Sequence, residues 1–333
     1  MAEEVWMLQT KKADFKQIGA RFRIDPVTAR IIRNRGIEGE AAIDRYLNGT
    51  LDDLYDPMLL KDMERAVSIL CEAVDTGKKI RIVGDYDIDG VCSTYILLQA
   101  FERLGSDVDF EIPDRIKDGY GINESIIEQA HADGVEVILT CDNGISAFHQ
   151  VELAKKYGMT VVITDHHEVP LDGEKEKIPP ADAVIDPKQA DCPYPFPEIC
   201  GAVVAYKLVQ VLYARRGVPQ MEWLDLLEFA AIATVGDVMK LQDENRILVK
   251  YGLKKMAQTK NLGLRRLAEK NNLDLGAITA YHIGFVIGPC LNAGGRLKTA
   301  KEALALLRAQ SEEEAERLAE ELKELNDTRK DKI

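Results

Sequence analysis

Residues 79–90 read KIRIVGDYDIDG and join an apolar strand to a run of acidic residues. The first half, 79–84, is rich in β-branched residues and is short, which predicts a buried strand. The second half places three aspartates at alternate positions directly after it. Because ligands of open α/β sheets bind beyond the carboxyl ends of the strands, these aspartates are candidates for a functional site.

Similar short runs alternate with segments of helical periodicity as far as residue 185. Strands separated by helices of about three turns predict an α/β fold, a mostly parallel sheet with helices on both faces. The further strands are expected at 107–112, 135–140, 160–164 and 183–185. The helices between them are expected at 93–104, 123–132 and 146–157.

The chain after this sheet is expected to form a helical section. A proline-rich stretch, 172–197, predicts an irregular surface loop. Helices should follow at 201–215, 221–235, 245–258, 275–287 and 299–307. The charged segment 311–330 predicts an exposed connecting helix. We therefore expect a lead-in over 1–60, an α/β domain over 61–200, a helical part over 201–310 and a connecting helix over 311–333.

Composition limits the function without deciding it. The 333 residues include 56 acidic and 43 basic ones, and the net charge of −13 argues against a protein that coats nucleic acid through bulk electrostatics. A nucleic-acid enzyme with a local basic track remains open, because metal ions can neutralise an acidic site. Six scattered cysteines without a Cys-x-x-Cys pair indicate reduced thiols in a cytoplasmic protein and disfavour a structural zinc site. No apolar run is long enough to cross a bilayer, so no membrane partner is expected.

Acidic side chains follow four of the predicted strands and one later apolar helix. Alone, an aspartate after a strand more often caps a helix or begins a turn, and adjacent histidines more often pack and hydrogen-bond. Converging carboxylates, however, repel one another strongly in a cleft unless cations lie among them. The groups are Asp85, Asp87 and Asp89; Asp142; Asp165, His166 and His167; Asp186; and Asp237.

Aspartate oxygens together with an imidazole nitrogen suit Mn²⁺ or Mg²⁺, and imidazole favours Mn²⁺. Two such ions can bind a phosphodiester and activate a water molecule, so the pattern predicts phosphoester hydrolysis. The DxDxDG run over 85–90 also matches half of a calcium-binding EF-hand loop. That interpretation fails, because the twelfth position is Ile96 instead of glutamate and a strand precedes the run.

The motifs together resemble the DHH phosphoesterase superfamily and, within it, the RecJ single-strand-specific exonucleases. They follow the family's order over roughly residues 80 to 300. They are GDYDIDG at 84–90 with Ser93-Thr94, IPDR at 112–115, GYG at 119–121, DNG at 142–144, DHH at 165–167, DP at 186–187, GA at 201–202, GD at 236–237 and NAGGR at 292–296.

The resemblance implies 5′-to-3′ hydrolysis of single-stranded DNA by a centre of two Mn²⁺ or Mg²⁺ ions. The implied metal ligands are Asp85, Asp87, Asp89, Asp142, His166 and Asp237, with Asp165 and His167 as supporting or metal-contacting groups. The implied nucleic-acid contacts are Arg115, Tyr120, Asn292, Gly295 and Arg296. Single-strand-binding protein or helicase partners are also expected.

Ordinary structural roles are the alternative for several of these residues. Arg115 could be an ordinary surface arginine, and Tyr120 could stack on a base or fill the underside of its loop. The segment 292–296 could be a glycine-rich turn between helices, although paired glycines also let a backbone approach a ligand closely.

Two departures from the family pattern bear on activity. Pro289 is followed by Cys290 where RecJ proteins carry arginine, so we expect one phosphate contact or salt bridge to be missing. RecJ proteins also continue past the position of Ile333 into a DHHA1 lobe and an oligonucleotide-binding fold, so we expect a catalytic part with a weaker grip on its substrate. The alternative functions are a small-substrate phosphoesterase of the oligoribonuclease or nucleotidase type, and a non-catalytic replication scaffold.

Overall fold

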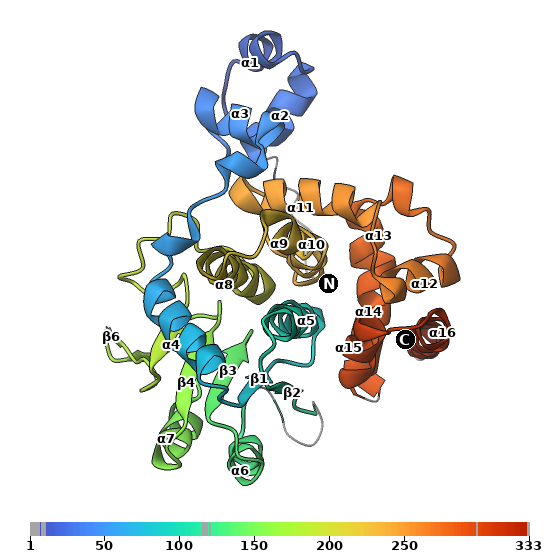
Figure 1. The fold of residues 1–333 in the computed structure, drawn as a ribbon. Coiled ribbons are helices and arrows are strands. Elements are labelled where there is room, and N and C mark those ends of the chain that lie inside the picture. The colour runs from blue at the N-terminus through green and yellow to red at the C-terminus, as the bar shows by residue number, and fades with distance from the viewer. Residues whose placement is uncertain (1–6, 8–10, 115–118, 120, 298, 332–333) are drawn as a thin grey trace, which may run out of the picture.

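The computed structural model describes residues 7, 11–114, 119, 121–297 and 299–331. At its centre lies a five-stranded sheet with strand order β2-β1-β3-β4-β7, and every pair is parallel. The α/β fold expected from the sequence is therefore confirmed (Figure 1). The strands are β1 (Ile80–Val83), β2 (Val108–Glu111), β3 (Val137–Cys141), β4 (Thr160–Thr164) and β7 (Ala183–Ile185).

Helices cover both faces of this sheet, as predicted. Alternate residues of a strand face opposite sides, so Ile138 packs on one cluster of helices and Leu139 on the other. The first cluster contains α6 (Glu124–Ala132) and α7 (Phe148–Lys156). The second contains α4 (Met63–Asp75), α5 (Ile88–Arg103) and α8 (Gly201–Arg216).

The helical section differs from its predicted outline at three places. The helix expected over 221–235 is two helices, α9 (Gln220–Leu224) and α10 (Leu227–Gly236), joined by a turn at which Asp225 forms ion pairs with Lys255 and Lys260. A further helix, α12 (Leu262–Lys270), was not expected at all. The helix expected over 275–287 is broken into η3 (Leu275–Ala277), α13 (Ala280–His282) and a π-helical turn, η4 (Ile283–Ile287), which runs on into α14 (Gly288–Leu297).

The last two helices pack together against the rest of the section. α15 (Lys301–Arg308) lies close to its expected place, and α16 (Glu312–Asp331) follows it. The prediction that α16 is exposed was wrong, because its stripe of Ala315, Leu318, Ala319 and Leu322 is buried against its neighbours. The many charged residues on the outer face of α16 made its narrow apolar face hard to recognise in the sequence.

The N-terminal helices form a small bundle away from the sheet (Figure 1). Their own core consists of Ile32, Ile37, Ile43 and Tyr46. They are α1 (Phe15–Phe22), α2 (Pro26–Asn34) and α3 (Glu40–Asn48), and the short turns η1 (Leu51–Asp53) and η2 (Pro57–Leu59) lead on to α4. The predicted irregular loop contains a small hairpin of β5 (Leu171–Asp172) and β6 (Lys175–Glu176). Within the described ranges, no helix has the length and apolar character needed to span a membrane.

A buried ion pair joins α8 to α11 (Asp243–Met256) beneath the N-terminal bundle. The ammonium of Lys207 lies 3.1 Å from Glu244 and donates to the backbone carbonyl of Tyr55 at 3.1 Å. Glu244 also accepts a hydrogen bond from the hydroxyl of Tyr194. Both charged side chains are fully buried, so each depends on the other for compensation.

Replacing Lys207 by methionine should destabilise the protein by about 3–5 kcal/mol, because the carboxylate of Glu244 stays buried without its cation. The free energy of unfolding in urea measures this loss. Lys207→Met combined with Glu244→Leu should recover most of it, and Lys61→Met, which removes an exposed pair with Asp191, should cost no more than about 1 kcal/mol. Equal losses for Lys207→Met and Lys61→Met would show that the buried pair is not structurally important.

Glu228 on α10 gives the stability a pH dependence. Its carboxyl is 3% exposed, and its Oε1 accepts a hydrogen bond from Thr259 at 2.7 Å. Burial raises its pKa from 4.5 to about 7. The folded state therefore holds a proton that the unfolded state releases, so stability falls as pH rises from about 4.5 through 7.

Glu228→Gln should be more stable than the original protein at pH 8, by an amount on the order of 3 kcal/mol, and equal to it near pH 4. Unfolding in urea at both pH values tests this. The exposed control Glu128→Gln should show no such difference. An advantage of Glu228→Gln that does not change with pH would contradict the assignment.

Candidate metal centre

The aspartates after β1 lie in a loop folded tightly onto the start of α5. Asp85 is buried at the end of the strand, and Asp87 caps α5 by accepting hydrogen bonds from the N–H groups of Asp89 and Gly90 at 2.9 and 3.1 Å. Any side chain at Gly90 would collide with the backbone of Asp85. Glycine is therefore required for the loop, defined here as the acid loop (85–89), to turn back on itself.

Asp89 is held by the N-terminus of α8, a helix 112 residues further along the chain. Its two oxygens accept hydrogen bonds from the N–H groups of Gly201 and Ala202 at 2.7 and 2.8 Å. Free N–H groups and the helix dipole both favour a carboxylate at this position. The sequence shows Gly201 and Ala202 only as one of the motifs of the resemblance, and it carries no local signal for this long-range contact.

Asp142 follows β3 with a φ of 60°, in the left-handed region that costs energy for a residue other than glycine. The next side chain holds the turn in place. Asn143 donates hydrogen bonds from Nδ2 to the carbonyls of Val83 and Cys141 at 3.0 and 2.9 Å, which ties the end of β1 to the end of β3. Asp142 is thereby fixed beside the acid loop.

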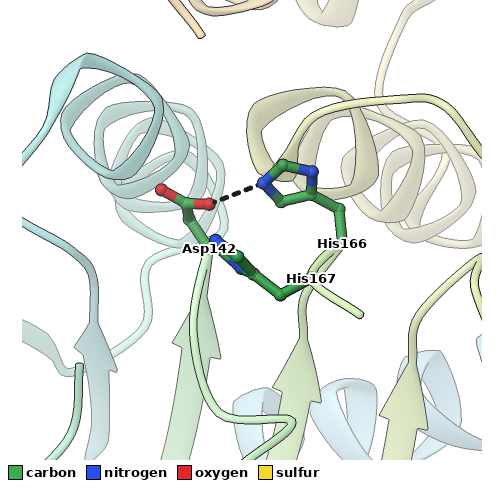
Figure 2. Close-up of side chains that lie close together, drawn as sticks. All are labelled: Asp142, His166 and His167. Carbon is green, nitrogen blue, oxygen red and sulfur yellow. Dashed lines mark hydrogen bonds and ion pairs between the residues drawn. The ribbon is translucent and has the colours of Figure 1, made fainter. Parts of the chain in front are cut away.

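The two histidines after β4 have different surroundings (Figure 2). The Nε2 atom of His166 lies 3.0 Å from Asp142 Oδ1, 3.4 Å from Asp89 Oδ2 and 3.9 Å from Asp237 Oδ2. His167 has its Nδ1 atom 2.7 Å from Asp165. His166 therefore lies among the carboxylates, and His167 is oriented by Asp165.

Asp165 holds the loops of the site together through hydrogen bonds. It accepts hydrogen bonds from the N–H groups of Ile145 at 2.9 Å and His166 at 2.7 Å in addition to its contact with His167. Burial opposes its ionisation, but the contact with His167 and the backbone donors outweigh burial and lower its pKa. The ionised form of Asp165 is thus favoured, and its oxygens are occupied by donors of the protein.

The predicted metal ligands converge at one edge of the sheet. Three overlapping groups have ligand atoms within 4.8 Å of one another. They are Asp142 with His166 and His167; Asp89 with His166 and Asp237; and Asp85 with Asp87 and Asp142. Carboxylate oxygens with one or two imidazole nitrogens are a suitable donor set for Mn²⁺ or Mg²⁺.

The electrostatics of the cluster also fit divalent cations. Burial, and then the charge of Asp87, raise the pKa of Asp85 to about 7. Burial and Asp89 raise the pKa of Asp237 to about 7, and the same causes raise the pKa of Asp142 well above its ordinary value. Burial lowers the pKa of His166, which favours the neutral imidazole that a metal requires. Bound cations would offset the repulsion that opposes ionisation of the carboxyls.

The NAGGR segment lies inside α14, so the alternative of a turn between helices was wrong. A side chain at Gly295 would collide with the carbonyl oxygen of Tyr86 in the acid loop. Gly295 therefore allows α14 to approach this loop, and Asn292 lies on the same helix. Arg115 and Tyr120 are outside the described residues, and so is the side chain of Arg296.

Cys290 is buried between helices, in contact with Asn271, which caps the C-terminus of α12, and with Asn326 of α16. Its sulfur lies 3.8 Å from Nδ2 of Asn271 and 3.5 Å from Nδ2 of Asn326. At this position we expected either a phosphate contact or a salt bridge to be missing. The packing around Cys290 favours the loss of a structural interaction.

Comparison with known proteins places these features in a family. Residues 79–234 match the model of the DHH family, N-terminal domain. The single-stranded-DNA-specific exonuclease RecJ of Bacillus subtilis (strain 168) is 38% identical over 325 residues, which cover 97% of this chain and 40% of that protein. RecJ of Escherichia coli (strain K12) is 36% identical over 319 residues, which cover 92% of this chain and 54% of that protein. The chain thus spans about half the length of these curated relatives.

Solved structures agree with this placement. A crystal structure of exonuclease RecJ bound to manganese superposes with a TM-score of 0.73 at 35% identity, covering 81% of this chain and 67% of the other. RecJ from Thermus thermophilus in complex with Mn²⁺ has a TM-score of 0.78 at 32% identity, covering 95% of this chain and 44% of the other.

Gly201→Ala should weaken Mn²⁺ binding about 10- to 100-fold, as loss of a supporting contact at a metal site does. The added Cβ would lie 2.7 Å from Cβ and 2.9 Å from Cα of Asp142, so Asp142 and Asp89 would both shift. Isothermal titration with Mn²⁺ measures the change. The control is Gly284→Ala, whose Cβ would make an ordinary 3.7 Å contact with Val235. Unchanged affinity in Gly201→Ala would mean that α8 does not position the ligands.

Proposed function

This chain belongs to the DHH family, within which it groups with the RecJ exonucleases, and we propose that it hydrolyses single-stranded DNA with two divalent metal ions, Mn²⁺ or Mg²⁺. The observation that carries the proposal is the convergence of five aspartates and an imidazole from separate segments at one sheet edge. The names of the relatives, which describe single-stranded-DNA-specific exonucleases and a manganese complex, support the substrate and the metal.

The overlapping ligand groups support two metal positions. Asp85, Asp87 and Asp142 would hold one ion, and Asp89, His166 and Asp237 would hold the other. The third group joins the two positions, because it contains Asp142 of the first and His166 of the second. When bound, the ions supply positive charge to the phosphate and lower the pKa of a water molecule.

The remaining groups of the centre orient the phosphate and the metal ligands. Asp165 fixes the ring of His167 at the mouth of the cluster, and we assign His167 to positioning the scissile phosphate. The N-terminus of α8 keeps the carboxylate of Asp89 from rotating, which preorganises a ligand before substrate arrives. Asp85, Asp89 and Asp142 are buried, so the protein shields their carboxylates from bulk water.

The finer assignments rest on the resemblance of the motifs. They are the 5′-to-3′ direction, the phosphate contacts of Arg115 and Arg296, the base contact of Tyr120, the partnership with single-strand-binding protein or a helicase, and the cytoplasmic location. Asn292 and Gly295 gain support from their helix, which packs on the acid loop. The scaffold alternative is disfavoured, because all six expected ligands are present and close together.

Asp142→Asn should lower hydrolysis of a 5′-labelled single-stranded oligonucleotide in Mn²⁺ at least about a hundredfold, because metal-ion catalysis is worth several kcal/mol. The measurement is the release of labelled mononucleotide on a gel. Asp191→Asn, an exposed aspartate paired with Lys61, is the matched control and should act like the original protein. EDTA should stop the reaction, and added Mn²⁺ should restore it.

Three outcomes would contradict this function. Release of internal fragments alone would exclude an exonuclease. A strong preference for dinucleotides or pyrophosphate over the long strand would favour the small-substrate alternative. Full activity of Asp142→Asn would remove the candidate centre from the reaction.

A further inference from the structure

Two large aromatic side chains lie stacked on the surface of the helical section. Tyr281 and Phe285 are 64% and 66% exposed, and their ring centroids are 4.8 Å apart with an interplanar angle of 26°. Single exposed apolar residues are common, but a stacked pair of rings presented to solvent is a ready-made contact surface. We call this pair the aromatic shelf.

The spacing of the two aromatic residues explains why both rings point outward. Tyr281 on α13 and Phe285 on η4 are four residues apart, so they share a face of the helix. Between and after them, Ile283 and Ile287 are buried on the opposite side. Single π-turns are rare and occur frequently at functional sites.

The segment that carries the shelf packs against two segments that hold metal ligands. A Cβ at Gly284 would lie 3.7 Å from Val235, two residues before Asp237. A Cβ at Gly288 would lie 3.3 Å from Ile88, the residue between Asp87 and Asp89. The inner side of η4 and its junction with α14 thus touch the segments that carry Asp237 and the acid loop, and the outer side carries the rings.

The residue after Asp237 is exposed on the same end of α10. Val238 has a φ of 57°, which is an outlier for a β-branched residue, and its side chain is 87% exposed. Strained residues of this kind cluster at functional sites. Lys240 follows on the surface, where its exposed pair with Glu198 at 3.4 Å leaves it able to contact a phosphate.

We propose that Tyr281 and Phe285 form a base-stacking platform for the single-stranded nucleic acid whose backbone enters the metal centre. The proposal rests on the proposed function and adds residues that bind bases instead of phosphates. Aromatic rings take any base, because every base has a π-face. Bases in a duplex already stack on one another, so the shelf would also favour single strands over double strands.

The test measures binding to two fluorescent 12-nucleotide strands, an oligothymidylate and an abasic strand with the same phosphates, at low salt in EDTA so that neither strand is cleaved. The original protein should bind the oligothymidylate more tightly. Tyr281→Ala and Phe285→Ala should each weaken this binding roughly tenfold and leave the abasic strand unchanged. Phe285→Trp should keep the preference.

The matched control is Tyr157→Ala. Tyr157 is also exposed and stacked on another ring, that of His131 with centroids 4.2 Å apart, but it precedes β4 and so lies at the opposite edge of the sheet. Its replacement should change neither affinity. Manganese titration of the shelf variants should match the original protein and exclude damage to the metal centre.

Equal binding of the two strands by the original protein would overturn the proposal, and so would equal weakening of both strands in the shelf variants. Unchanged affinity in those variants would do the same and point to another occupant, such as a protein segment. Hydrolysis is measured separately, in Mn²⁺. A base preference that depends on the shelf in a protein without nuclease activity would sustain the platform and reject the proposed function.

Discussion

Mutual repulsion among buried carboxylates at one edge of the sheet is the constraint on which this structure depends. Parallel strands bring their carboxyl ends together, so Asp85, Asp142 and Asp165 meet as a consequence of topology. The protein compensates some of this charge itself, through the N-terminus of α8 for Asp89 and through His167 and backbone donors for Asp165. For Asp85 and Asp237 the compensation is smaller: burial and neighbouring carboxylates raise their pKa values to about 7, and bound divalent cations would favour their ionised forms.

The helical section packs closely against this edge of the sheet. Glycines at 201, 236 and 295 stand where a side chain would strike Asp142, Ile88 or the backbone of Tyr86. The three helices can therefore pack closely on this edge of the sheet: α14 on the backbone of the acid loop, α10 on the side chain of Ile88 and α8 on Asp142. Asp237 directly follows α10, and the aromatic shelf lies on α13 and η4, which lead into α14, so ligand position and the outer surface are parts of one packing arrangement.

The sheet and the ligand set could be predicted because their signals are local. β-Branched runs mark the strands, and an aspartate after each run marks the common edge. Contacts between distant segments leave no such signal: the capping of α8 by Asp89 joins residues 112 apart, and the breaks at Asp225 and Ile283 depend on the neighbours of each helix. The burial of α16 was missed for a related reason, because its charge dominates a stripe of only four small and aliphatic residues.

The double task of Asp89 also bears on how such a chain can change over evolutionary time. This carboxylate is a candidate ligand and at the same time the cap of a buried 16-residue helix, so its loss would remove a metal contact and leave two N–H groups unsatisfied inside the protein. Asp237 is more exposed and caps the start of no helix. A lineage that abandoned catalysis would therefore be free to replace Asp237 early, while selection for folding alone would retain Asp89 as a trace of the lost chemistry.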